Sequence, residues 1–145
     1  MQKEIKHTFF FPHPLEMVWD HLTKPELLSQ WLMENDLQPV VGHKFQFRSK
    51  PALSIEFDGI VYCEIREVVS FKKLSYTWNC TPTNTGYKIE TLVMWTLSPK
   101  DNGTELLLHQ TGFKENENEL FYMAMNSGWT KQVEKFLQNL NSPAK

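Results

Sequence analysis

Residues 93–110 read VMWTLSPKDNGTELLLHQ, and this stretch decides the fold class. Apolar and polar residues alternate on both sides of Asp101-Asn102-Gly103, which is the pattern of strands with one buried face. An Asn-Gly pair in a short connection is typical of a β-hairpin. The sequence therefore predicts an antiparallel hairpin, with its inward positions at Val93, Trp95, Leu97, Leu106, Leu108 and Gln110.

The same period of two extends upstream to Lys44. Three further strands, one before the turn signal at Asp58-Gly59 and two after it, show apolar residues at every second position. Because few residues separate these strands, neighbours must pair antiparallel, since a parallel crossover needs a dozen residues or more. The inward positions are predicted to be Phe45, Phe47, Val61, Cys63, Ile65, Leu74, Tyr76 and Trp78.

The first 36 residues predict one strand followed by two short helices. Alternation from Ile5 to Phe11 predicts a strand that ends at Pro12 and Pro14, and helical spacing follows from Leu15 to Leu22. In the second helix we expect Thr23 to be the cap of a capping box with Glu26, and Pro25 to occupy the first turn. Asn35-Asp36 is the expected helix end.

The C-terminal segment predicts one long helix, from about Asn116 to Asn141. It would be roughly 36 Å long at 1.5 Å per residue, enough to cross a sheet. Such a helix and such a sheet bury their apolar faces best against each other. We therefore predict an α+β helix-grip fold in a single domain, 1–145: a curved antiparallel sheet of about six strands around the long C-terminal helix. Its apolar face is expected at Phe121, Met125, Trp129, Val133, Phe136 and Leu140.

Charge and composition exclude several classes of protein. Fifteen Lys and Arg against 17 Asp and Glu give a net charge of −2, without the basic excess of a nucleic-acid-binding protein. No stretch approaches the roughly 18 apolar residues of a membrane span, and the N-terminus does not resemble a signal peptide. We expect a cytoplasmic protein with neither nucleic acid nor membrane as its partner.

Catalytic and metal-binding patterns are not found in the sequence. The five histidines show no HxxxH or HExxH spacing, and there is no GxSxG motif or glycine-rich phosphate loop. Cys63 alternates with apolar neighbours and is predicted to be a small buried hydrophobe. Cys80 follows an expected strand end, where it could be exposed. We therefore predict no catalytic residue, no metal site and no cofactor.

The aromatic residues are the informative group, at 13% of the chain. Core packing alone would explain any one ring, but several rings pointing to one interior can also line a cavity. Gln110 is the best candidate for a polar group in such a cavity, and Met123 and Met125 would give it an adaptable wall. The predicted ligand-binding residues are Trp31, Phe45, Phe47, Tyr76, Trp78, Trp95, Gln110, Met125 and Trp129.

Four stretches together resemble the activator-of-heat-shock-ATPase homologues of the START/SRPBCC (Bet v 1-like) superfamily. The resemblance covers roughly residues 3 to 140. It implies a helix-grip domain whose relatives include binding, transport and catalytic proteins. The stretches are residues 14–19 with 24–31, 59–61 with 74–78, 103–106 with 112–113, and Gly128-Trp129 with Val133 and Leu137.

Three functions remain open at this point. The first is a non-catalytic domain that binds a hydrophobic or aromatic small molecule. The second is a protein-interaction module, a co-chaperone or stress-response adaptor whose partner is a chaperone or a second copy of the chain. The third is a polyketide cyclase-type enzyme, ranked last because only Gln110 and Tyr76 are predicted polar groups inside. The resemblance also implies that an additional N-terminal domain drives the chaperone's ATPase in the eukaryotic co-chaperones, and we expect no such stimulation from these 145 residues alone.

Overall fold

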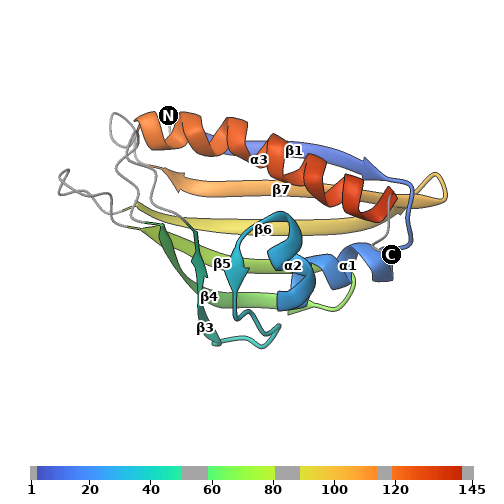
Figure 1. Ribbon diagram of the computed structural model, residues 1–145, viewed down its shortest axis with the longest axis horizontal. Helices are drawn as coiled ribbons and strands as arrows, with labels where there is room; N and C mark the ends of the chain where they lie inside the picture. The colour runs from blue at the N-terminus through green and yellow to red at the C-terminus, as the bar shows by residue number, and fades with distance from the viewer. Residues whose placement is uncertain (1–2, 50–58, 81–88, 114–118, 142–145) are drawn as a thin grey trace.

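The computed structural model describes residues 3–49, 59–80, 89–113 and 119–141. It contains seven strands and three helices, in the order that the sequence predicts (Figure 1). The elements are β1 (Lys3–Phe11), α1 (Leu15–Thr23), α2 (Pro25–Trp31), β2 (Glu34–Asn35), β3 (Lys44–Arg48), β4 (Ile60–Val69), β5 (Lys73–Cys80), β6 (Ile89–Lys100), β7 (Gly103–Phe113) and α3 (Glu119–Asn141).

All seven strands form one antiparallel sheet, in the order β1-β7-β6-β5-β4-β3-β2. The three helices lie on one face of this curved sheet, with α3 running along β1 and β7 and with α1 and α2 beside it (Figure 1). The predicted α+β helix-grip fold is therefore confirmed. The sheet has one strand more than the roughly six predicted, because the two residues of β2 pair with the end of β3.

The β6–β7 hairpin closes through Asp101 and Asn102, the first two residues of the predicted turn Asp101-Asn102-Gly103, whereas Gly103 already begins β7. Asp101 and Asn102 have φ angles of 49° and 66°, and Lys100 pairs with Gly103. This left-handed pair is the conformation that matches the twist of two-residue hairpins. Gly103 is required for space rather than for its φ, since an added Cβ would collide with the carbonyl oxygen of Phe11 on β1.

The core lies between the sheet and the helices, on the face that the alternation predicts. Every inward position expected for β3 to β7 is buried, as are Trp129, Val133, Phe136 and Leu140 of α3. Met125 is partly buried against this core. The predicted helix start at Asn116, the residue Asp58 and the side chain of Phe121 lie outside the described residues.

Local details of the helices differ from the prediction. Thr23 does not cap α2: its hydroxyl donates to the carbonyl of Trp19, one turn back in α1, and the N-cap is Lys24. The second helix ends at Trp31, earlier than Asn35-Asp36. Asn35 instead shapes the turn beyond the helix, where its side-chain oxygen accepts from the amide of Leu37.

Two side chains lie in surroundings that the sequence did not suggest. Cys80 is buried, because β5 continues through it at an inward position. Met123 is 58% exposed and faces away from the core, so it cannot form the wall expected of it. No helix in the described ranges is long and apolar enough to cross a membrane.

Candidate functional site

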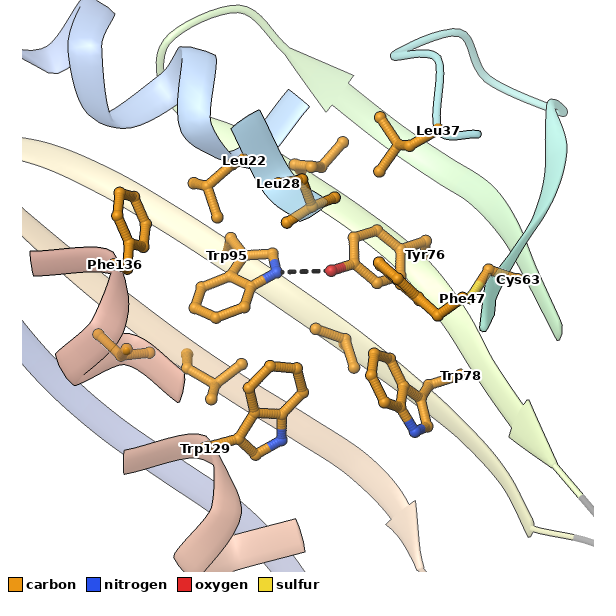
Figure 2. Close-up of a cluster of buried hydrophobic side chains, with 14 of the residues drawn as sticks. Leu22, Leu28, Leu37, Phe47, Cys63, Tyr76, Trp78, Trp95, Trp129 and Phe136 are labelled. Atoms are coloured by element: carbon orange, nitrogen blue, oxygen red, sulfur yellow. Dashed lines mark hydrogen bonds between the residues drawn. The ribbon is translucent and has the colours of Figure 1, made fainter. Parts of the chain in front are cut away.

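The predicted aromatic residues form one connected cluster in the interior (Figure 2). Trp95 on β6 lies edge-on to Trp31 of α2 and to Trp129 of α3, at centroid distances of 6.1 and 5.4 Å. Trp129 also contacts Trp78 of β5 at 5.2 Å, and Trp78 contacts Phe47 of β3 at 5.2 Å. The cluster joins the sheet to two helices, and its rings fill the centre of the interior.

Three of the four clustered indoles donate a hydrogen bond to a protein acceptor. Trp31 donates to the carbonyl of His21 at 2.9 Å, and Trp95 donates to the hydroxyl of Tyr76 at 2.9 Å (Figure 2). Trp129 donates to the side-chain oxygen of Gln110 at 2.8 Å. The fourth indole, that of Trp78, has no such acceptor among the residues that the structure describes.

Gln110 lies inside, as predicted, but both ends of its amide bind protein groups. Its oxygen accepts from Trp129, and its nitrogen donates to the hydroxyl of Thr91 at 2.9 Å. That hydroxyl donates in turn to the carbonyl of Trp78 at 2.8 Å. Gln110 is therefore the centre of a chain of hydrogen bonds from α3 to β5.

Burial shifts two ionisable groups of this interior, Tyr76 and Cys63, toward their neutral forms. Desolvation raises the pKa of the Tyr76 phenol, against a smaller opposing effect of the hydrogen bond from Trp95. Desolvation also raises the pKa of the Cys63 thiol. Because the thiolate is the reactive form of cysteine, Cys63 is unsuited to nucleophilic chemistry.

A pocket of about 270 Å³ remains at one end of the cluster, between α3 and the ends of α2 and β3. Its walls are largely apolar, with Trp78 and Trp129 as the two aromatic surfaces. Such an apolar concavity with a few polar groups is the usual form of a small-molecule site. The lining residues are Leu32, Met33, Ser49, Trp78, Ala124, Met125, Gly128, Trp129 and Gln132.

Gly128 gives this pocket part of its width. It lies in the middle of α3, where glycine destabilises a helix by about 1 kcal/mol relative to alanine. A Cβ added at this position would meet no atom within 4 Å, so no close packing requires the glycine. The missing side chain leaves open space at the pocket wall.

The sequence profile of the family described as Activator of Hsp90 ATPase homolog 1-like protein matches residues 12–141. The chain belongs to this family. The resemblance predicted from the sequence is thereby confirmed. No curated protein matches the sequence.

Several solved structures share the fold of this chain. Protein MLL2253 from Mesorhizobium loti is 32% identical, with a TM-score of 0.87 over 99% of this chain and 100% of its own. BH1534 from Bacillus halodurans is 27% identical, with a TM-score of 0.76 over 95% and 98%. The Aha1 dimer from Colwellia psychrerythraea shares the fold at 15% identity, with a TM-score of 0.79 over 99% of both chains.

In this member of the Activator of Hsp90 ATPase homolog 1-like family, three of the nine predicted binding residues line the pocket: Trp78, Met125 and Trp129. Trp31, Phe45, Phe47, Tyr76, Trp95 and Gln110 lie outside it. The other six lining residues were not predicted. Gly128 carried a usable signal, a glycine inside a strongly predicted helix, whereas Leu32, Met33, Ser49, Ala124 and Gln132 carried none.

A larger hollow of about 570 Å³ lies on the outer face of β3, β4 and β5. Its lining is mainly outward-facing polar side chains, including Lys44, Gln46 and Asn79. Two of its charges pair with each other, Arg66 with Glu64 at 3.9 Å. No group of three or more His, Cys, Asp or Glu side chains in the described part of the chain is placed to hold a metal ion.

Proposed function

We propose that this protein binds one small apolar or aromatic molecule in the pocket between α3 and the sheet. The observation that carries the proposal is the pocket itself, whose lining includes two indoles and the flexible side chain of Met125. Flat aromatic walls and an adaptable thioether suit an aromatic ligand. The proposal narrows the nine predicted residues to Trp78, Met125 and Trp129.

The volume of the pocket limits the size of the ligand. An apolar cavity of about 150 Å³ in another protein is enough to bind benzene. A pocket of about 270 Å³ is therefore large enough for one or two fused rings. It is smaller than the roughly 300–1,000 Å³ of most drug-sized sites, which favours a compact ligand.

Gly128 supports the proposal independently. Glycine destabilises the helix here, and no close packing against the glycine offsets that loss, since no atom lies within 4 Å of the position that a Cβ would take. A larger side chain there would extend into the space between Trp129 and Gln132. The glycine thus preserves the volume in which a ligand would lie.

The lining supports binding rather than conversion. Among the lining residues that the structure describes, none is an acid, a base or a thiol. Proton transfer in a reaction needs a positioned titratable group, and Tyr76 and Cys63 lie outside the pocket with pKa values raised by burial. A cyclase-type activity therefore has less support.

The test is a binding assay with naphthalene and indole, followed by tryptophan fluorescence and calorimetry. We expect micromolar affinity, because burial of the ligand's apolar area is partly offset by ordering costs. Gly128→Leu should weaken binding at least roughly 10-fold by filling the pocket. Thr130→Leu, on the exposed face of the same helix, is the matched control and should bind normally. Absence of binding to the wild-type protein, or equal binding by Gly128→Leu, would refute the proposal.

A protein-interaction module is the second candidate, favoured by the family description and by the dimer of the Colwellia relative. It is tested by sedimentation of the pure chain and by ATP turnover of an added heat-shock ATPase. Dimerisation or several-fold stimulation that survives Gly128→Leu would support this function over ligand binding.

A further inference from the structure

The indole nitrogen of Trp78 is a buried hydrogen-bond donor without an acceptor in the described part of the chain. Trp78 is 2% exposed, so its N–H has also been removed from bulk water. Figure 2 shows this nitrogen pointing away from Tyr76 and Trp95, the polar pair at the centre of the cluster. An unpaired buried donor destabilises the folded chain, and an acceptor on a ligand in the adjoining pocket would recover that loss.

The side-chain oxygen of Gln132 is the complementary group. It is buried and has no donor among the described residues, and Gln132 lines the same pocket as Trp78. Gln132 lies on α3 one helical turn after Gly128, so it faces the space that the glycine leaves open. The residues that line the pocket therefore include one unused donor and one unused acceptor, both covered by neighbouring atoms that a ligand would have to displace to reach them.

The charge of the lining residues disfavours anionic ligands. The described lining residues include no Lys, Arg or His. An ionised carboxylate buried here would lose its hydration without gaining a cation, and it would also face the oxygen of Gln132. A fatty acid or an aromatic acid is thus a poor match to this pocket.

We propose that the pocket selects neutral aromatic molecules that carry a hydrogen-bond acceptor and a hydrogen-bond donor together, such as aromatic carboxamides and hydroxy ketones. The acceptor binds the indole N–H of Trp78, and the donor binds the side-chain oxygen of Gln132. This selectivity rests on the proposed function, because it requires that a ligand enter the pocket.

Four naphthalenes of similar size separate the contributions of the acceptor, the donor and the charge of the ligand. Naphthalene-1-carboxamide offers an acceptor and a donor, 1-acetylnaphthalene offers an acceptor only, 1-methylnaphthalene offers neither, and naphthalene-1-carboxylate is an anion. Each is titrated by calorimetry at neutral pH against the wild-type protein, Trp78→Phe and Gln132→Leu. Circular dichroism confirms that each variant is folded. Gln132 is only partly buried, so its variant keeps the test valid if Trp78→Phe does not fold.

Trp78→Phe should weaken the binding of the carboxamide and of the ketone roughly 5- to 10-fold, which corresponds to the loss of one hydrogen bond. It should change the affinity for the hydrocarbon less than about twofold. Gln132→Leu should weaken the carboxamide by a similar factor and leave the ketone and the hydrocarbon unchanged or tighter. The carboxylate should bind at least roughly 10-fold more weakly than the carboxamide.

If both variants lose as much affinity for the hydrocarbon as for the carboxamide, the inference is overturned while the proposed function stays intact. Tighter binding of the carboxylate than of the carboxamide would also overturn it. A ketone as sensitive to Gln132→Leu as the carboxamide would overturn the acceptor role of Gln132. If none of the four compounds binds the wild-type protein, the proposed function fails as well.

Discussion

The side-chain oxygen of Gln110 on β7 accepts a 2.8 Å hydrogen bond from the indole nitrogen of Trp129 on α3. Both side chains are buried, with exposed fractions of 0% and 2%. The bond connects the sheet to its long helix within the part of α3 that lines the pocket. It is directional, whereas the apolar contacts around it are not, so it fixes how Trp129 is oriented above Trp78 and Trp95.

Trp129→Ala should lower the free energy of unfolding by about 3–5 kcal/mol, because it removes a fully buried ring and leaves a cavity. Urea denaturation followed by circular dichroism measures the loss. Thr130→Ala, its exposed neighbour, is the control and should stay within about 0.5 kcal/mol of the wild type. A loss below about 1 kcal/mol for Trp129→Ala would contradict the burial of this helix face.

Gln110→Leu should cost about 1–3 kcal/mol, because it leaves the N–H of Trp129 buried without an acceptor. The double variant Gln110→Leu with Trp129→Phe removes both partners. It should therefore lose less than the sum of the two single variants, a coupling of about 1 kcal/mol. Denaturation curves of the wild type, the two single variants and the double variant measure this coupling. Additive losses would mean that the hydrogen bond contributes nothing to stability.

Sequence periodicity predicted the strands, the long helix and the inward residues, because each is set by local alternation and burial on one face. The turn at Asp101-Asn102 was predictable for the same reason, since its residue types tolerate positive φ. The hydrogen bond of Thr23 was not predictable. Its hydroxyl can reach either the next helix or the carbonyl of Trp19, and only the packing of α1 against α2 decides which partner it binds.

The residues that line the pocket were not all predicted, for a physical reason. Alternation says which side chains point inward, but not which of them fill the interior and which border a space. Trp95 and Tyr76 fill it by pairing with each other, across two neighbouring strands. The pocket lies beside α3 and includes Leu32 and Ser49, which come from segments whose spacing relative to α3 no local pattern encodes.

Two glycines should respond in opposite ways to the same substitution. Gly103→Ala should cost about 1–3 kcal/mol, because its Cβ would meet the carbonyl of Phe11 and atoms of Phe10 and Pro12. Gly128→Ala should raise stability by about 0.5–1 kcal/mol, because alanine favours the helix and meets open space. Thermal and urea denaturation of both variants test this. A loss of stability for Gly128→Ala would mean that the space at the pocket wall is already occupied.

The stability of the protein should fall as the pH rises above about 9. Burial raises the pKa values of Cys63 and Tyr76 above their ordinary values of 9.0 and 10.0, so the unfolded chain releases these protons before the folded one does. Their contribution is thus fully present below the unfolded pKa values and is lost as the pH rises toward the folded ones.

Between neutral pH and about pH 10.5 this loss should be about 2 kcal/mol from Cys63 and about 1 kcal/mol from Tyr76. Urea denaturation at the two pH values measures it, with Cys63→Ala and Tyr76→Phe as variants. Each substitution lowers stability at neutral pH by its own amount, since Tyr76→Phe also removes the acceptor of Trp95. The informative quantity is therefore the difference between the two pH values, which each variant should reduce by the share of its own group. A variant that loses as much stability as the wild type over this interval would show that its group ionises equally in the folded and unfolded states, which its burial in the cluster does not allow.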